Sequence, residues 1–406
     1  MERKIHSNGE LIIGKPYITH AAGKARINSD VIVNGDGKVV WFEVPEEYSK
    51  YLCAERGDGF LIGMLYTAIH SHYDLRCEIP IGEELLYNLN KCLIPAVVKS
   101  CPGLYAPKIM AEVDSSVIKS EGAVGTGISC GVDSLHAIAS NMSEEYPSRK
   151  ITHLVLCNVG SFSQHEGQYD YQRELASRFA REVGLAYVET NSNLHHAFPR
   201  SNLYAVKYSL GFAIYMLQKL WGTYLYASDG YDFRDCNLSE HAIENSSWMD
   251  ALSAICFSTH SLSVVNVGLE MERIDKLREI VDYAPSWKYL HVCESNTGPN
   301  CGLCGKCLRT LTALEALGAL ERYRAVFDVD SYLKRKNANY WWLCDQQVSP
   351  FGDVMTRQTY ELLKDKIPLW MKLGVRAKWK WRNLYDRLSR VKILRIIAGR
   401  DRRRGR

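Results

Sequence analysis

Apolar runs alternate with helix-like segments from residue 121 onward. Short runs of aliphatic and small residues predict strands at 123–128, 152–158, 186–190 and 223–228. Between them, apolar residues recur at helical spacing over 134–141, 169–183 and 203–219. Strands that alternate with helices are typical of a parallel sheet covered on both faces. The pattern therefore predicts a parallel, doubly wound α/β sheet.

The residues before 121 follow a different pattern. Val31–Val33 and Val39–Phe42 flank the turn-forming Asn34–Gly37, which predicts a β-hairpin, and apolar helical stretches begin near Phe60 and Leu85. We expect a smaller N-terminal α+β accessory domain, a nucleotide-binding domain and a C-terminal helical extension with a basic tail. Their expected bounds are 1–120, 121–320 and 321–406.

A short polar loop follows the first predicted strand of the sheet. It consists of Ser129, Cys130, Gly131, Val132, Asp133 and Ser134. Small residues let the backbone approach an anion, backbone amides and a helix N-terminus favour negative charge, and serine hydroxyls add donors. The loop therefore predicts a site for nucleotide phosphates. The alternative is a plain turn in which Asp133 and Ser134 cap the helix.

Two other strand ends are expected at the same edge, because ligands lie beyond the carboxyl ends of parallel strands. The second strand ends at Asn158 and Val159, and the fourth is followed by Asp229 and Asp232. Asp229 and Asp232 are interpreted either as contacts to Mg²⁺ or substrate or as turn residues. Both interpretations stay open.

Four cysteines lie in a segment rich in turn-forming residues. They are Cys293, Cys301, Cys304 and Cys307. Two overlapping CxxC steps place three thiols on one knuckle, Cys293 can complete a tetrahedron, and three such thiols cannot all pair locally as disulfides. The spacing predicts structural Zn²⁺, although an iron–sulfur cluster also takes thiolate ligands.

The polar loop resembles the SGGxDS pattern of the PP-loop ATP pyrophosphatases, with Cys130 in place of a glycine. Together with the cysteine knuckle and the Arg309 that follows it, residues 121–318 resemble the 7-cyano-7-deazaguanine synthase family. The resemblance implies a PP-loop ATPase-like fold of the HUP class. It also implies ATP and Mg²⁺ at the loop, adenine near Asn158 and Val159, and a phosphate contact from Arg309.

The resemblance further implies an AMP- and pyrophosphate-forming C–N ligase. Such an enzyme adenylates a small, deazapurine-like carboxylate, and ammonia or an amine then displaces AMP to give an amide, with a nitrile after a second activation. No catalytic residue is assigned, because AMP is a good leaving group. A tRNA-modifying PP-loop enzyme of the thiolation type, deazaguanine-type modification of a partner protein, and a binding module without chemistry are the alternatives.

Basic residues near the knuckle have two interpretations. Arg273, Lys276 and Arg278 lie on a predicted helix at 271–280. In the family that the chain resembles, a basic residue in this region meets phosphate, whereas ordinary helix-surface charge explains the same residues equally well.

Composition narrows the class of protein. The chain has 406 residues, 46% of them hydrophobic, and thirteen cysteines that fall largely in apolar runs. Thiols of this kind without a secretory signal favour a cytoplasmic protein. No apolar stretch is long enough to span a bilayer, and the best candidate, Leu210–Leu217, lies between Lys207 and Lys219 and is expected to be a buried helix.

Charge is segregated along the chain. The net charge is +4, yet the segment from Lys372 to Arg406 contains fourteen Lys or Arg and two Asp. Apolar residues recur at helical intervals within this tail, at Trp379, Trp381, Leu384, Leu388, Val391, Leu394 and Ile397. The pattern suits an anionic membrane surface, a nucleic acid or an acidic partner protein. A docked terminal helix with a solvated face is the alternative, and homodimerisation is a further open expectation.

Overall fold

The structure, a computed structural model, describes residues 6–160, 167–200, 202–229, 232–234, 246–294, 298–350 and 352–401. The chain divides into two compact units, one ending at Asn300 and the other beginning at Cys301. Each unit is described by itself. Of the predicted tail positions, Leu388, Val391, Leu394 and Ile397 have side chains outside the described part.

The first part of unit 1 is a set of strands with three helices. Its strands are β1 (Gly9–Ile13), β2 (Tyr17–Ala21), β3 (Lys24–Val33), β4 (Asp36–Pro45), β5 (Tyr73–Cys77), β6 (Ile81–Gly82), β7 (Ile109–Met110) and β8 (Val113–Asp114). Its helices are α1 (Asp58–Ser71), α2 (Glu83–Asn88) and α3 (Ile94–Ser100), and a π-helical turn at Leu89–Leu93 joins the last two. The predicted hairpin is confirmed, because β3 pairs with β4 with Val33 opposite Asp36.

The second part of unit 1 alternates strands and helices. The strands are β9 (Ala123–Gly127), β10 (His153–Asn158), β11 (Ala186–Ser192), β12 (Trp221–Ala227) and β13 (Ser263–Val267). The helices are α4 (Val132–Asn141), α5 (Gln168–Val183), α6 (Leu194–Ala197), α7 (Asn202–Met216), α8 (Asp250–Cys256), α9 (Arg273–Ile280) and α10 (Ser286–Tyr289). The four predicted strands and three predicted helices are confirmed, and β13 is a strand that the sequence pattern did not predict.

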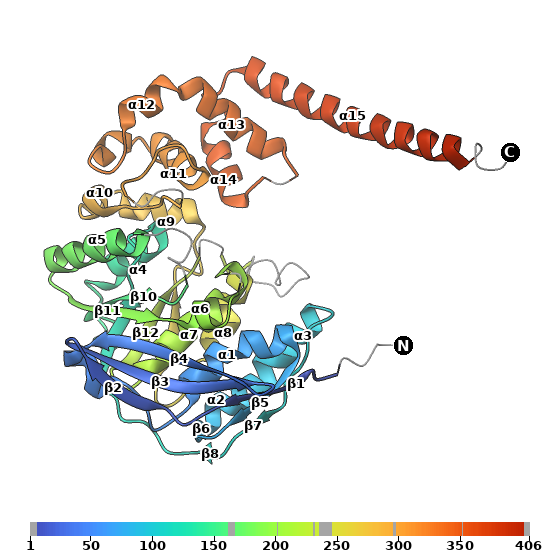
Figure 1. The fold of residues 1–406 in the computed structure, drawn as a ribbon. Helices are drawn as coiled ribbons and strands as arrows, with labels where there is room; N and C mark the ends of the chain where they lie inside the picture. The colour runs from blue at the N-terminus through green and yellow to red at the C-terminus, as the bar shows by residue number, and fades with distance from the viewer. Residues whose placement is uncertain are drawn as a thin grey trace. The chain divides into compact units, whose positions relative to one another are not determined.

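Both parts of unit 1 share one mostly parallel sheet (Figure 1). Among the described residues, its hydrogen-bonded path runs through ten strands in the order β13-β12-β9-β10-β11-β4-β3-β1-β5-β7, and β2 pairs with β3 beside this path. Strands β13 to β11 are parallel, and β11 meets β4 in an antiparallel pair in which Asn191 lies opposite Glu43. The fold is therefore α/β, and the N-terminal strands extend the sheet beyond the five parallel strands β13 to β11. The domain bounds near 120 and 320 stay predictions.

The order of the strands places β9 at the centre of five parallel strands. After β9 the chain builds β10 and β11 on one side and then returns to build β12 and β13 on the other. The crevice between β9 and β12 is thus a point where the winding reverses, which is where open α/β sheets bind ligands.

A buried aromatic cluster ties the two parts of unit 1 together. Phe212 of α7 makes edge-on contacts with Phe42 of β4 and Phe60 of α1, at centroid distances of 5.7 and 5.8 Å. Gly63 of α1 permits this close packing, because a Cβ there would lie 2.8 Å from the Phe212 ring. Leu210–Leu217, read from the sequence as a buried helix, lies in and just after α7 and is largely buried.

Unit 2 is helical. It contains α11 (Gly305–Ala316), α12 (Val329–Lys334), α13 (Lys336–Val348), α14 (Val354–Leu363) and the long α15 (Leu369–Asp401) (Figure 1). Helix α11 ends shortly before Gly318. Gly318 follows it at φ +69°, a left-handed conformation that glycine adopts without strain. In the part of the chain that the structure describes, no helix has the length and apolar character needed to cross a membrane.

Candidate functional site

The polar loop at the end of β9 is held by its own hydroxyls. The Oγ atoms of Ser129 and Ser134 lie 3.1 Å apart, and the Gly131 amide donates to Ser129 Oγ at 3.4 Å. Gln172 of α5 donates to the Ser129 carbonyl at 2.6 Å, which fixes the start of the loop. Helix α4 begins directly after Gly131, so the unpaired amides of its first turn lie at the loop. This arrangement suits an anion.

Cys130 occupies the loop position that requires a left-handed backbone. Its φ is +54°, which costs a non-glycine residue roughly 1–2 kcal/mol. The side chain is fully buried, and burial raises the pKa of the thiol, so the thiol stays protonated at neutral pH. Its carbonyl accepts a hydrogen bond of 2.8 Å from the His291 amide. The cysteine therefore keeps the backbone path of a glycine at this position.

Two cations of α9 face the loop. Arg273 Nη1 lies 2.5 Å from Asp133 Oδ2, and the fully buried Lys276 donates to the Ser228 carbonyl at 2.8 Å. Lys276 Nζ is also 3.7 Å from Asp133 Oδ1. Burial lowers the pKa of Lys276, while the Asp133 carboxylate opposes that shift. The helix-surface interpretation is therefore wrong for Arg273 and Lys276.

The same interpretation is correct for Arg278. Its guanidinium is more than half exposed and pairs with Asp275 one turn earlier on the same helix. Helix α9 thus has one charge-bearing face toward the loop and one toward solvent.

A second buried cation, Lys207, lies near the end of β12, on the other side of the crevice between β9 and β12. Lys207 of α7 donates to Tyr226 Oη and Asp229 Oδ2, both at 2.7 Å, and pairs with the buried Asp250. Burial lowers the pKa of Lys207, but the carboxylates of Asp229 and Asp250 outweigh it and hold that pKa well above its usual value. The pKa of Asp250 is raised to about 6, chiefly by burial. This cluster fixes Asp229, whereas Asp232 pairs with Arg234 instead.

A cavity of about 270 Å³ opens between the loop and these groups. Its lining comprises Gly127, Ile128, Ser129, Asp133, Ser134, Val155, Leu156, Cys157, Val206, Leu210, Tyr224, Tyr226, Ala227 and Asp229. The volume is just below the roughly 300–1,000 Å³ typical of small-molecule sites. One end carries serine hydroxyls and carboxylates, and the walls are aliphatic and aromatic. Asp133 Oδ1 is buried there without a hydrogen-bond donor.

The predicted adenine contacts lie beside this cavity. The lining from β10 comes from Val155, Leu156 and Cys157. Asn158 Nδ2 donates to Asn191 Oδ1 at 2.9 Å, and Val159 is buried. Their role at adenine stays a prediction.

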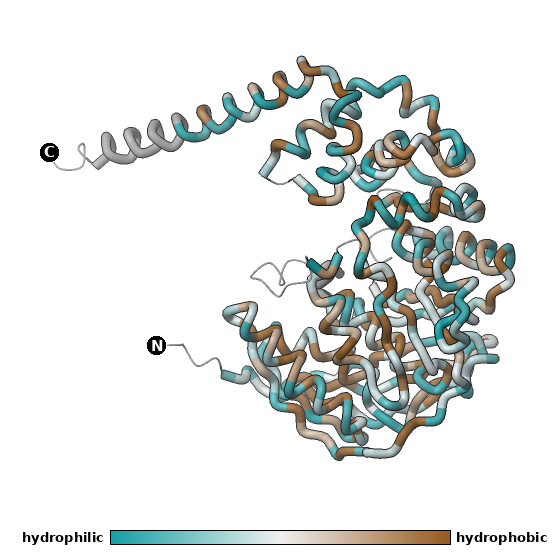
Figure 2. The backbone as a smooth tube through the Cα atoms, turned by 180° about the vertical axis from the view of Figure 1, so that it is seen from behind, coloured by the Kyte–Doolittle hydropathy of each residue, from teal (hydrophilic) through white to brown (hydrophobic). Residues whose placement is uncertain are grey.

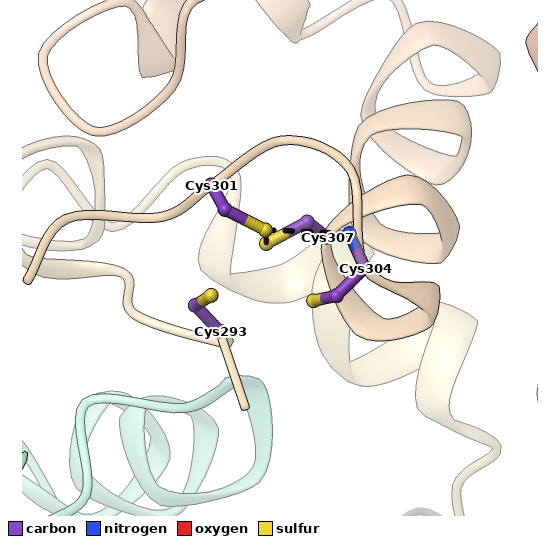
Figure 3. A group of neighbouring side chains, drawn as sticks. All are labelled: Cys293, Cys301, Cys304 and Cys307. Atoms are coloured by element: carbon purple, nitrogen blue, oxygen red, sulfur yellow. Dashed lines mark hydrogen bonds between the residues drawn. The ribbon is translucent and has the colours of Figure 1, made fainter. Parts of the chain in front are cut away.

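The four predicted metal ligands come together (Figure 3). The Sγ atoms of Cys293, Cys301, Cys304 and Cys307 all lie within 4.8 Å of one another. A tetrahedral zinc site with bonds of about 2.3 Å requires sulfur separations of about 3.8 Å, so only a small adjustment is needed. The cluster could therefore hold a metal such as zinc.

The local backbone supports this cysteine cluster. Gly302 turns the chain at φ +69°, and the amides of Leu303 and Cys304 donate to Cys301 Sγ at 3.4 and 3.3 Å. Cys304 then caps α11, whose first turn carries Cys307.

Arg309 lies farther along α11, and its guanidinium pairs with Asp353 at 2.5 Å within unit 2. Asp353 also caps α14 by accepting from the Met355 amide. The phosphate contact expected of Arg309 stays a prediction.

Sequence reasoning missed three residues of the site: Gln172, Lys207 and Asp250. The one available signal was Lys207, a charged residue inside a strongly apolar helix, where a lysine needs buried partners. Comparisons of the chain with protein-family models, curated proteins and solved structures found no match. The functional argument therefore rests on the geometry of these residues.

Proposed function

We propose that this chain is an ATP-dependent C–N ligase of the PP-loop type, built on a doubly wound sheet of the HUP class. The observation that carries the proposal is the loop Ser129–Ser134, which runs from the end of β9 into the first turn of α4 at the reversal of winding, with Arg273 and Lys276 facing it. Hydroxyls, helix amides and two cations together suit a triphosphate.

ATP is the proposed nucleotide, with its phosphates on the loop and its base in the adjoining cavity. Asp133 Oδ1 is a buried carboxylate oxygen without a hydrogen-bond donor, which fits a ligand for Mg²⁺. The ion would neutralise phosphate charge. Binding of the nucleotide would also give Arg273 and Lys276 a second anionic partner beside Asp133.

The proposed reaction has two displacements. A carboxylate oxygen of the substrate attacks the α-phosphorus, and the bond to the β-phosphate oxygen breaks to release pyrophosphate. The nitrogen of ammonia or an amine then attacks the acyl carbon, AMP leaves with the electron pair of the broken C–O bond, and the nitrogen loses a proton. The chain contributes positioning and charge stabilisation, for which the buried cations are already in place.

The cavity walls favour a flat, largely apolar carboxylate. Tyr224, Val206 and Leu210 contribute aromatic and aliphatic groups to the lining, and Tyr226 and Asp229 contribute polar groups. Such a lining suits a deazapurine-like ring, with polar contacts to its ring nitrogens or exocyclic groups.

Pyrophosphate release tests the proposal. The full chain is given ATP, Mg²⁺, 7-carboxy-7-deazaguanine and ammonium, and the product is identified by mass. We expect pyrophosphate and an amide or nitrile, and loss of both in Asp133→Ala. Asp275→Ala, which removes a partly exposed carboxylate of α9, is the matched control and keeps activity. Bound ATP without pyrophosphate release, for every carboxylate offered, contradicts the ligase proposal.

We further propose that the cysteine cluster holds structural Zn²⁺, since four thiolates leave no open position for water or substrate. Metal analysis of the purified chain should find about one zinc per chain and no acid-labile sulfide. Cys301→Ser should lose the metal and lower the thermal midpoint. Iron with stoichiometric sulfide would contradict zinc and favour the tRNA-thiolation alternative.

A further inference from the structure

The first turns of helix α15 pack with one face against the other helices of unit 2. Met371, Val375 and Trp379 are buried in one cluster with residues of α13 and α14. The indole of Trp379 donates to Asp345 at 3.0 Å, and Lys378 donates to the same carboxylate at 2.7 Å. Over the first third of α15, the face that packs against unit 2 is therefore the one that carries Met371, Val375 and Trp379.

The opposite side of α15 is apolar and exposed. Six large apolar residues are 46–72% exposed: Leu369, Trp370, Leu373, Trp381, Leu384 and Tyr385. At about 100° per residue, these positions fall within an arc of roughly 160°, whereas the three docked residues occupy an arc of roughly 80° on the other side. Figure 2 shows the alternation of apolar and polar residues along this helix. We call this arc the outward face.

Cations border the outward face. Arg376, Lys380 and Arg387 lie along one border, as the same helical spacing places them. Lys378, which donates to Asp345, lies just beyond the other border, and Arg382 lies farther round, over the Trp379 ring. All five are exposed. Long Lys and Arg side chains can extend from an apolar layer to polar headgroups. An exposed apolar arc bordered by a row of cations is the pattern of a helix that lies in a membrane interface.

We propose that α15 binds flat on an anionic membrane surface through its outward face. Charge complementarity argues for this occupant, because the segment from Lys372 onward carries fourteen Lys or Arg against two Asp. Trp370, Trp381 and Tyr385 are of the residue types that favour the boundary between headgroups and acyl chains. The helix lies on the membrane and does not cross it, in keeping with its hydropathy.

Two other occupants fit the outward face less well. A second copy of α15 would bring two strongly cationic helices together, which like-charge repulsion opposes. A nucleic acid would pair with the cations but would leave Trp381 and Leu384 in water, because phosphate contacts bury little apolar surface. Lipid satisfies both the charge and the apolar arc.

Vesicle flotation of the full chain tests the proposal. We expect binding to vesicles of phosphatidylcholine mixed with phosphatidylserine, roughly tenfold weaker binding to phosphatidylcholine alone, and release at high salt. Trp381→Ser with Leu384→Ser should weaken binding at least about tenfold, since two large side chains lose their burial. Lys380→Glu with Arg387→Glu should do the same.

Matched controls separate this surface from general charge and folding. Lys334→Glu with Lys366→Glu makes the same charge change at exposed positions elsewhere in unit 2 and should leave binding unchanged. Circular dichroism checks that the variants keep their helix content. Equal flotation of wild type and Trp381→Ser/Leu384→Ser overturns the proposal. Absence of flotation also overturns it. Binding of a DNA or RNA duplex would then indicate a nucleic acid as the occupant, and a dimer in light scattering that these substitutions disrupt would indicate a second copy.

Discussion

Two cavities of similar size lie in unit 1, and their charges are arranged differently. The first adjoins the loop Ser129–Ser134 and has a volume of about 270 Å³. The second, of about 320 Å³, is lined by Arg56, Asp58, Gly82, Glu83, Glu84, Leu85, Asp114, Ser115, Ser116, Val117, Thr259, His260 and Ser261. Both contain buried ionisable groups, so neither volume nor buried charge separates them.

The two cavities differ in the partners of their buried ionisable groups. In the second cavity, buried Arg56 donates to Asp114 at 2.7 Å and also to Ser116, and Asp58 accepts from the Gly82 amide at 2.8 Å. In the first, Asp133 Oδ1 is buried without a hydrogen-bond donor, Lys276 Nζ lies 3.7 Å from it, and much of the lining is apolar. A buried polar atom that the fold leaves unsatisfied is costly unless a ligand supplies its partner. We therefore propose the first cavity as the ligand site and interpret the second as a structural cluster.

The largest expected effect is at the first cavity. Lys276→Met removes a buried cation opposite Asp133 while keeping the length of the side chain, so we expect pyrophosphate release to fall about 10²–10³-fold. Arg278→Met, two residues later and exposed, is the matched control and should change the rate less than about twofold. An unchanged rate in Lys276→Met would remove the main support for the site.

The second cavity should respond in stability instead. Arg56→Met leaves the buried Asp58 without its cation, and breaking a buried pair costs about 3 kcal/mol of unfolding free energy. Urea denaturation measures this loss, with the partly exposed Arg76→Met as the control at well under 1 kcal/mol. ATP affinity should stay unchanged in both variants. If Arg56→Met lost ATP binding but kept its full unfolding free energy, the second cavity and not the first would be the ligand site.

Local pattern predicted the parts of the first site that are close in sequence. The strand β9, the loop Ser129–Ser134 and the start of α4 follow one another directly, so strand propensity and small residues indicate them together. The cysteine cluster was predictable for the same reason, since its ligands fall between Cys293 and Cys307.

Long-range partners were beyond the sequence. Arg273 and Asp133 are 140 residues apart, and only the packing of α9 against α4 brings them together. Strand β13 is short, and Asn266 interrupts its run of valines, so its pattern is weak. Strand β11 pairs with β4 along the edge of the parallel strands, and the sequence of neither strand specifies its partner.

The pH dependence of stability gives a smaller and sharper test of the second cavity. Burial raises the pKa of Asp58 from 3.8 to about 6, against the Gly82 hydrogen bond and the Arg56 charge. Between these values the folded chain binds the proton more tightly than the unfolded chain, so the unfolding free energy falls as pH rises through this window. Asp58 should account for about 2 kcal/mol of that fall.

Asp58→Asn should remove this share of the slope in urea denaturation curves measured across the same window. Asp250, whose pKa is also raised to about 6, keeps a residual slope of the same sign in the variant. A slope that does not change in Asp58→Asn would show that the carboxyl is solvated and that the second cavity is open to water.

The smallest expected effect concerns the loop itself. Cys130→Gly relieves the cost of a left-handed backbone at φ +54°, about 1 kcal/mol, but it also removes a fully buried side chain of similar worth. The two terms nearly cancel, so the unfolding free energy should change by less than about 1 kcal/mol. Pyrophosphate release should persist, because the thiol is buried and the backbone path is kept. Abolished release in Cys130→Gly would give the thiol a role in the first cavity, and the loop could then no longer be described by its backbone alone.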